Sequence, residues 1–293
     1  MSTDSSEGEF TLSNADFQRV RRLVKERSGI DLGEGKRALV YGRLARRLRQ
    51  LGLRSFAEYL PLVEEGDEAV RFINALTTNV TDFFREAHHM EVLAEQVVPE
   101  AIARVRKHTG EPRRLRIWSA GCSTGEEPYS IAIALCELGA ALDGWDVKIL
   151  ATDLDSDALA TAAGGRYAAD RVGKVGAARL GRWFTPLVSE GRRAGDGRRY
   201  QVIPEVRGLI TFTQLNLLEH WPMRGPFDAI FCRNVIIYFD DPTKRALVRR
   251  YHDILRPEGY LFLGHSESLV GAGLGFVCDG RTVYRPCGPE VAS

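Results

Sequence analysis

Residues 118–130, Trp-Ser-Ala-Gly-Cys-Ser-Thr-Gly-Glu-Glu-Pro-Tyr-Ser, combine two glycines with two adjacent glutamates. An apolar, β-prone run precedes them and an apolar helical stretch follows at 131–138, so Gly121 and Gly125 lie in a predicted strand-to-helix turn. Glycine permits backbone angles and close approaches that a Cβ forbids, and the helix begins with free N–H groups. The segment therefore predicts a ligand-binding turn.

The two glutamates limit which ligand this turn can bind. A dinucleotide fold would place a pyrophosphate there, where it would meet Glu126 and Glu127. Two carboxylates repel a phosphate and favour a cation or a hydroxylated sugar. S-adenosylmethionine, a nucleoside with a sulfonium and an ammonium but no phosphate, fits this preference. The alternative is that the glutamates only complement the helix dipole.

Asp153 ends the next predicted strand along the chain. A carboxylate in this place can accept hydrogen bonds from both ribose hydroxyls, each contributing about 1.5 to 3 kcal/mol. Taken alone, Asp153 could equally be a helix N-cap, whereas Asp155 and Asp157 are better placed to complement the dipole of the next helix. Combined with the glycine turn, Asp153 is predicted to bind the cofactor.

The composition disfavours several classes of protein. The 293 residues carry 40 basic and 39 acidic side chains, a net charge of +1, which argues against a dedicated nucleic-acid-binding protein. No apolar run reaches the length of a membrane span and no export signal is visible, so we expect a cytoplasmic monomer. Five scattered cysteines disfavour disulfides and zinc. His88 and His89 would point to different sides of a helix, so no metal site is predicted.

The first part of the chain predicts a small helical bundle. Apolar residues recur at helical spacing in residues 13–28, 36–51, 56–64 and 68–77. Ser13, with Asp16 three residues later, is the expected N-cap of the first helix, and Gly29 and Gly52 follow the first two helices. We assign residues 1–84 to this helical domain and its linker.

The rest of the chain predicts an α/β domain over residues 85–293. After a helix at about 87–108, strands at 115–119, 147–152, 227–233 and 260–264 alternate with helices, which indicates a parallel sheet covered on both faces. The strand ends Ser119, Asp153 and Asn234 would converge on one crevice. Short β runs from 184 to 213, interrupted by the Gly- and Arg-rich loop 191–199, predict a small antiparallel insertion.

Two further stretches place polar residues among apolar ones. The first, residues 76–86, contains Asn79, Thr81 and Arg85, and the second, residues 231–239, contains Arg233, Asn234 and Tyr238. Buried polar groups must be satisfied by hydrogen bonds, so both stretches are candidate binding segments. A purely structural role, with Arg85 and Glu86 as a surface pair, is the alternative.

Together these motifs resemble the chemotaxis receptor methyltransferases of the CheR type, which use S-adenosylmethionine to methylate glutamate side chains on receptor cytoplasmic helices. The resemblance extends from about Phe17 to Arg285 and is carried by residues 77–85, 118–130, 151–155, 216–217, 231–240 and 259–268. It implies a small N-terminal helical bundle followed by a class I, Rossmann-like, S-adenosylmethionine-dependent methyltransferase domain with a small antiparallel β insertion.

The resemblance also implies roles for individual residues. Arg85 would lie near the cofactor's carboxylate, and Asp153 with either Glu126 or Glu127 would hold its ribose and amino-acid ends. Which glutamate does so stays open. Tyr238 would lie near the transferred methyl, so Tyr238 and Arg85 are the candidate catalytic residues. The implied cofactor-binding residues are Asn79, Thr81, Arg85, Gly121, Glu126, Glu127, Asp153, Asn216, Leu217, Arg233 and Asn234.

The family's helical domain faces the receptor, and the charges of this chain agree with that role. Residues 36–54 contain several basic side chains and no acidic one. A basic stripe suits an acidic helix bundle because opposite fields speed and orient encounter. A solvated face and a nucleic-acid surface are the alternatives. In some family members the β insertion also binds a C-terminal receptor peptide. The stripe comprises Lys36, Arg37, Arg43, Arg46 and Arg47.

The implied reaction needs no general base. A glutamate with a reference pKa of about 4.3 is ionised at neutral pH, so its oxygen can attack the sulfonium methyl directly. Catalysis is then positioning in a site that excludes water. A nucleic-acid N-methyltransferase would need an Asn/Asp-Pro-Pro-aromatic turn where residues 234–238 read Asn-Val-Ile-Ile-Tyr. A non-catalytic cofactor-sensing module would show a damaged pocket, and the pocket motifs here are intact.

Overall fold

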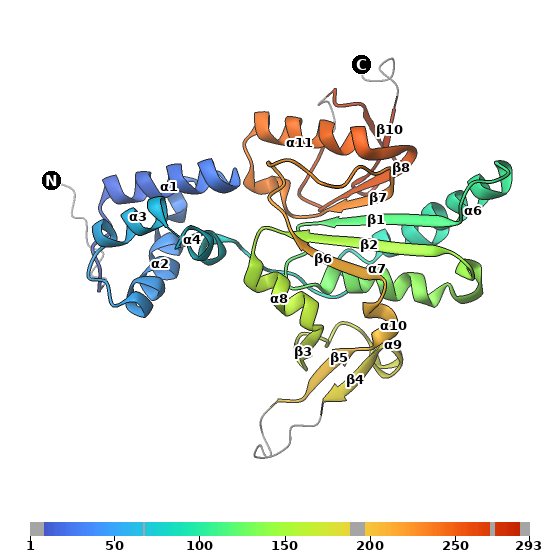
Figure 1. Ribbon diagram of the computed structural model, residues 1–293, viewed down its shortest axis with the longest axis horizontal. Coiled ribbons are helices and arrows are strands. Elements are labelled where there is room, and N and C mark those ends of the chain that lie inside the picture. The colour runs from blue at the N-terminus through green and yellow to red at the C-terminus, as the bar shows by residue number, and fades with distance from the viewer. Residues whose placement is uncertain (1–8, 67, 188–196, 270–272, 288–293) are drawn as a thin grey trace. The chain divides into compact units, whose positions relative to one another are not determined.

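The computed structural model describes residues 9–66, 68–187, 197–269 and 273–287. The chain forms two compact units, Met1–Thr78 with Tyr238–Thr243, and Asn79–Ile237 with Lys244–Ser293 (Figure 1). The first division lies at Thr78, earlier than the expected boundary at residue 84, so the motif containing Asn79 and Arg85 belongs to the second unit. Most of the predicted loop 191–199 lies outside the described residues.

The first unit contains the predicted helices, α1 (Asn14–Ser28), α2 (Arg37–Leu51), α3 (Phe56–Glu65) and α4 (Glu68–Leu76), with a 3₁₀ turn η1 (Glu34–Lys36) before α2. Ser13 caps α1 in a capping box with Asp16, as predicted. Gly29 and Gly52 take left-handed angles, φ 73° and 67°, after α1 and α2. Local capping chemistry thus accounts for where these helices begin and end.

The segment Tyr238–Thr243 packs within this helical unit although it is remote in sequence. The N–H of Asp31 donates to the carbonyl of Tyr238 at 2.8 Å, and Ile30 forms an antiparallel bridge with Phe239. Lys25 Nζ lies 2.9 Å from Asp240 Oδ2. The helical unit is therefore completed by residues that follow the fourth core strand of the sequence.

The second unit opens with a helical segment that differs from the single helix predicted at 87–108. It consists of α5 (His88–Val92), a π-helical turn η2 (Leu93–Val97) and α6 (Val98–Lys107). Pro99 lies in the first turn of α6 and has no N–H to bond the preceding turn, which explains the wider turn before it.

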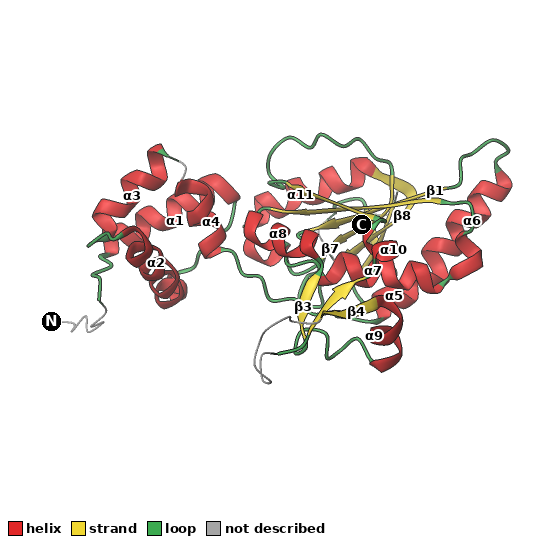
Figure 2. Ribbon diagram, turned by 60° about the horizontal axis from the view of Figure 1, so that its bottom comes forward, coloured by secondary structure: helices red, strands yellow, loops and turns green. Residues whose placement is uncertain are grey.

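The main sheet has seven strands in the order β6-β2-β1-β7-β8-β10-β9. The first five, β6 (Ile210–Gln214), β2 (Asp146–Asp153), β1 (Arg114–Ala120), β7 (Phe227–Cys232) and β8 (Leu255–Leu263), are parallel. Of the last two, β10 (Val283–Pro286) runs antiparallel to β8, and β9 (Phe276–Cys278) runs antiparallel to β10. Helices α7 (Glu126–Glu137), α8 (Ser156–Gly164) and α11 (Asp241–Ile254) flank the sheet, and a 3₁₀ turn η3 (Gly139–Leu142) follows α7 (Figure 2).

The register brings the carboxyl ends of the parallel strands to one edge. Ala120 pairs with Thr152, Asp153 with Gln214, and Cys232 with Leu263. The chain leaves β1 toward β2 but leaves β7 toward β8, so the strand order reverses between β1 and β7. Open α/β sheets bind ligands at such a switch point.

The smaller sheet corrects one prediction. It is antiparallel, ordered β3-β5-β4, and contains β3 (Arg166–Ala168), β4 (Phe184–Leu187) and β5 (Arg199–Val202), with α9 (Ala177–Trp183) before β4 and α10 (Pro204–Arg207) after β5. The run 209–213, expected in this insertion, instead forms β6 in the main sheet, parallel to β2. Ile210 and Phe212 pack against buried residues of the main domain, which explains the difference.

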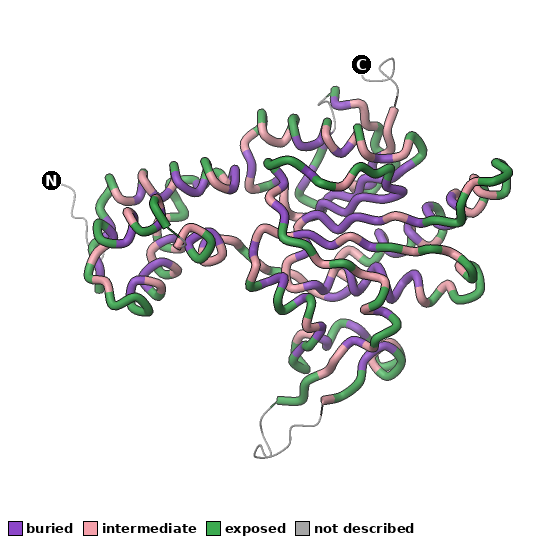
Figure 3. The backbone as a smooth tube through the Cα atoms, in the orientation of Figure 1, coloured by how far each residue is buried: buried purple, intermediate pink, exposed green. Residues whose placement is uncertain are grey.

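The central strands of the main sheet are the most buried part of the second unit (Figure 3). All residues of β7 are buried, and Phe231 stacks on Phe262 of β8 with ring centroids 4.2 Å apart. Trp118 of β1 packs edge-on against Trp221 at 4.8 Å. Within the described ranges, no helix combines the length and apolarity needed to cross a membrane.

Candidate functional site

The glycine turn between β1 and α7 has the predicted strand-turn-helix form. Gly121 has φ 93°, and a Cβ there would lie 2.4 Å from Cγ2 of Val235 in the loop after β7. Gly125 has φ 97°, and its Cβ would lie 2.8 Å from both Ala162 and the Tyr167 hydroxyl. Both positions therefore require glycine for conformation and for space.

Asp153 lies beside this turn at the end of β2. Its Oδ2 accepts from the Ser123 N–H at 2.6 Å and its Oδ1 from the Asp155 N–H at 2.9 Å. Each oxygen keeps a further lone pair for a ligand hydroxyl. Burial raises the pKa of Asp153 to about 6 despite these hydrogen bonds. Asp155 is the N-cap of α8, as its sequence position indicated.

The predicted linker residues Asn79, Thr81 and Arg85 differ in their contacts with the carboxyl edge of the main sheet. Asn79 donates to Asp155 Oδ2 at 2.6 Å and accepts from Ser123 Oγ at 3.1 Å, which places it against the glycine turn. Arg85 donates to the Val80 carbonyl at 3.1 Å. Thr81 lies between them and is half-buried. The structure thus brings Asn79 to the predicted site through direct contacts.

The two glutamates of the turn have different environments. Glu126 is fully buried and accepts from Thr124 Oγ1 at 2.7 Å and from the Arg171 guanidinium. Glu127 accepts from Ser119 Oγ at 2.8 Å and lies 3.4 Å from Nη1 of Arg233. Burial raises the pKa of Glu127, against the opposing charge of Arg233. Glu126 therefore has a buried ion pair with Arg171, and Glu127 shares the edge of the sheet with Arg233, while the contact of either glutamate with the cofactor stays a prediction.

Glu267 organises the loop after β7, a role that the sequence did not reveal. Its buried carboxylate accepts from four backbone N–H groups, those of Asn234, Val235, Ile237 and Gly264, at 2.6 to 3.2 Å. Asn234 has a positive φ of 61°. A Cβ on Gly264 would lie 2.5 Å from Asn234 Nδ2. The predicted segments 231–240 and 259–268 are therefore in contact.

Asn216 and Leu217 follow β6 at the same edge. The preceding residue, Leu215, donates its N–H to the Asp153 carbonyl at 3.0 Å. Asn216 Oδ1 accepts from the Leu218 N–H at 3.1 Å, and the Leu217 carbonyl accepts from Arg250 at 2.7 Å. The turn after β6 is thereby fixed beside Asp153.

The structure changes one prediction about the remaining candidates and leaves another untested. His88 and His89 do not diverge, because both Nε2 atoms lie 3.1 Å from the same Arg281 carbonyl. No group of three potential metal ligands occurs in the described part of the chain. Tyr238 belongs to the helical unit, so its place near the transferred methyl stays a prediction.

Most arginines of the predicted basic stripe have partners within the helical unit. Arg43 donates to the Leu76 and Thr77 carbonyls at 2.8 and 2.6 Å and so caps α4. Arg47 pairs with Glu68 at 2.5 Å, and Arg37 donates to the Leu12 carbonyl. The stripe is therefore partly compensated by residues distant in sequence. The exposed cations of the stripe include Lys36 and Arg46. Arg49, one turn beyond on α2, is also exposed and pairs with Glu9.

Comparison with known proteins identifies the family. The model of the CheR methyltransferase all-alpha domain matches residues 15–77, and that of the CheR methyltransferase SAM binding domain matches residues 79–283. The chain belongs to the CheR methyltransferase family. It is 48% identical over 282 residues to chemotaxis protein methyltransferase 2 of Pseudomonas aeruginosa, covering 95% of both chains. It is 44% identical to the chemotaxis protein methyltransferase of Salmonella typhimurium, over 93% of this chain and 90% of that protein.

This CheR family member is a methyltransferase that uses S-adenosylmethionine. The residues at the switch point fit that cofactor. Glu127 and Asp153 offer carboxylates for an ammonium and for ribose hydroxyls at this edge of the sheet. The first turn of α7 carries two acidic residues, which suits a cofactor without phosphate.

The four N–H groups that donate to the Glu267 carboxylate predict that this residue contributes to the free energy of unfolding. We expect Glu267→Gln to lower the free energy of unfolding by about 1 to 3 kcal/mol, because an amide NH₂ would face buried N–H donors. Denaturant unfolding measures this loss, with the exposed Glu258→Gln as the control. Equal free energies of unfolding for the two variants would show that these hydrogen bonds to Glu267 are dispensable for stability.

Proposed function

We propose that this methyltransferase transfers methyl groups to glutamate carboxylates on the cytoplasmic helices of chemoreceptors. The observation that carries the proposal is the 48% identity to a chemotaxis protein methyltransferase over 95% of both chains. In this proposal the protein acts in the cytoplasm, where such helices lie. The charge pattern of the helical unit supports an acidic partner, because Lys36, Arg46 and Arg49 are exposed.

The proposed site residues bind different parts of the cofactor. Asp153 holds the ribose, Glu127 the ammonium, and Arg85 the carboxylate of the cofactor, while Asn79, Asn216, Leu217, Arg233 and Asn234 complete the pocket. Thr81 contributes from the linker and Tyr238 orients the substrate carboxylate. The cofactor supplies an electrophilic methyl group when bound.

No residue of this chain has to remove a proton from the substrate. A substrate glutamate is already ionised at neutral pH, since its reference pKa is about 4.3. The residues of the pocket therefore position the reactants and exclude water, and no side chain is required as a base. This agrees with the histidines near the site, because burial lowers the pKa of His89 to about 4 and its Nε2 already contacts the Arg281 carbonyl.

The proposal predicts a carboxyl ester. When the enzyme is incubated with methyl-labelled S-adenosylmethionine and receptor cytoplasmic fragments, we expect the label to be released as methanol at high pH. Fragments with glutamine in place of the surface glutamates are the control and should remain unlabelled. Label that survives alkali would show an N-methyl product and refute the proposal.

A further inference from the structure

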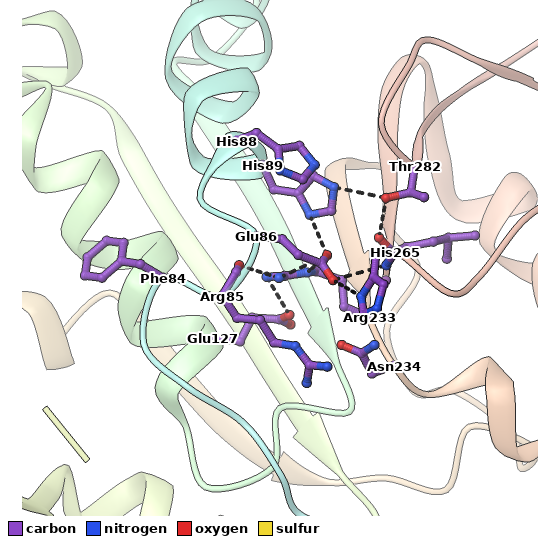
Figure 4. A network of polar contacts seen from close by, with 12 residues as sticks. Phe84, Arg85, Glu86, His88, His89, Glu127, Arg233, Asn234, His265 and Thr282 are labelled. Atoms are coloured by element: carbon purple, nitrogen blue, oxygen red, sulfur yellow. Dashed lines mark hydrogen bonds and ion pairs between the residues drawn. The ribbon is translucent and has the colours of Figure 1, made fainter. Parts of the chain in front are cut away.

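Arg233 is a buried guanidinium shared between two carboxylates. Its side chain is 3% exposed, and its Nε donates to Glu86 Oε2 at 3.2 Å while Nη1 lies 3.4 Å from Glu127 Oε2 (Figure 4). Nη2 also donates to the Arg85 carbonyl. The position of Arg233, and through it that of Glu127, therefore depends on residues 85 and 86.

Glu86 is itself firmly held. Its Oε1 accepts from the backbone N–H of His265 at 3.1 Å and lies 3.0 Å from the His265 Nδ1 (Figure 4). Its backbone has a φ of 53°, uncommon for a residue with a side chain, which indicates that surrounding contacts fix it. Burial alone would raise the pKa of Glu86, but Arg233 and the His265 hydrogen bonds together outweigh burial and lower it.

The cluster Glu86, Arg233 and Glu127 has unequal charges. Two carboxylates share one guanidinium, which leaves one negative charge uncompensated. The neighbouring His89 is neutral at physiological pH because burial lowers its pKa to about 4. The Arg85 side chain hydrogen-bonds to the Val80 carbonyl and is assigned to the cofactor's carboxylate. An additional cation, such as an ammonium, would offset the negative charge that these three side chains leave.

We propose that Glu86 is a positioning residue for cofactor binding. Because Glu86 pairs with Arg233, the guanidinium does not pair with Glu127 alone, and Glu127 stays available to the ammonium of S-adenosylmethionine. Without the Glu86 charge, Arg233 turns to Glu127 alone and neutralises it. The inference rests on the proposed contact between Glu127 and the ammonium. It does not depend on which substrate is methylated.

Two probes separate this role from general damage to the pocket. S-adenosylhomocysteine carries the ammonium, whereas 5′-methylthioadenosine keeps the adenine, ribose and thioether but lacks the amino-acid end. By calorimetry, Glu86→Gln should weaken S-adenosylhomocysteine about five- to tenfold and change methylthioadenosine less than about twofold. Glu86→Asp, which keeps the charge, should restore part of the affinity. Glu100→Gln, which breaks an ion pair with Arg285 outside this cluster, is the matched control and should change neither.

Each outcome bears on the proposal. Equal losses for both probes, or an unchanged affinity for S-adenosylhomocysteine, would overturn it. Glu127→Gln tests the contact on which it rests: if that variant binds S-adenosylhomocysteine normally, the ammonium lies elsewhere and the role of Glu86 fails with it. A normal Glu86→Gln beside a weakened Glu127→Gln refutes the role of Glu86 alone. If Glu86→Gln does not fold, Arg233→Lys, whose compact ammonium cannot span both carboxylates, should give the same selective loss.

Discussion

Asp153→Asn should weaken binding of S-adenosylhomocysteine at pH 7.5 by about 10- to 100-fold, because hydrogen bonds to a charged acceptor contribute about 1.5 to 3 kcal/mol. The carboxylate is prepared for this role by two backbone donors, the N–H groups of Ser123 and Asp155, which fix its plane. Calorimetry measures the loss. The exposed Asp157→Asn, in the first turn of α8, is the matched control. An unchanged affinity would exclude Asp153 from the site.

The raised pKa of Asp153 gives this prediction a pH dependence. Since that pKa is about 6, affinity of the native protein for S-adenosylhomocysteine should fall as the pH drops from 7.5 to 5, and Glu127 acts in the same direction. The free energy of unfolding changes in the opposite direction and rises as the pH falls. A carboxyl whose pKa is higher in the folded than in the unfolded state binds its proton more tightly when folded, so its contribution to stability grows as the pH falls through 6. Asp153→Asn should flatten both profiles, and a pH-independent native affinity would contradict the assignment.

Local patterns in the sequence were sufficient for the main elements of the fold. The capping box of Ser13 and Asp16 and the glycine after α1 specify that helix within a few neighbouring residues. The glycine turn is equally local, since strand, turn and helix follow one another without a gap. These predictions succeeded because the interactions that decide them span only a few positions.

The missed features depend on contacts between distant residues. Ile210 and Phe212 alternate as in any short strand, and only packing against Ala151 and Leu159 assigns them to the main sheet. Glu267 has no local signature, because three of its four donors, the N–H groups of Asn234, Val235 and Ile237, belong to a different loop. The environments of Glu126 and Glu127 likewise depend on Arg171 and Arg233, which are distant in sequence. The role of each glutamate at the cofactor stays a prediction.

The exposed face of α2 allows a sharper test of receptor docking than the stripe as predicted from sequence. Arg43 and Arg47 are unsuitable, because Arg43 caps α4 and Arg47 pairs with Glu68. Arg46 and Arg49 lie three residues apart and are exposed, and the Arg49 pair with Glu9 is solvent-accessible and contributes little to stability. Their replacement should therefore leave the fold intact.

We expect Arg46→Glu combined with Arg49→Glu to reduce methylation of the receptor at limiting receptor concentration by more than about tenfold at low salt, since like charges would then face an acidic bundle. Affinity for S-adenosylhomocysteine should be unchanged. Arg245→Glu with Arg249→Glu, on an exposed face of α11, makes the same charge change and should have little effect. The native rate should also decline with added salt, because exposed charges are screened over about 8 Å at physiological ionic strength. Equal rates for the two double variants would mean that this face of α2 is only a solvated surface, and that the receptor binds elsewhere.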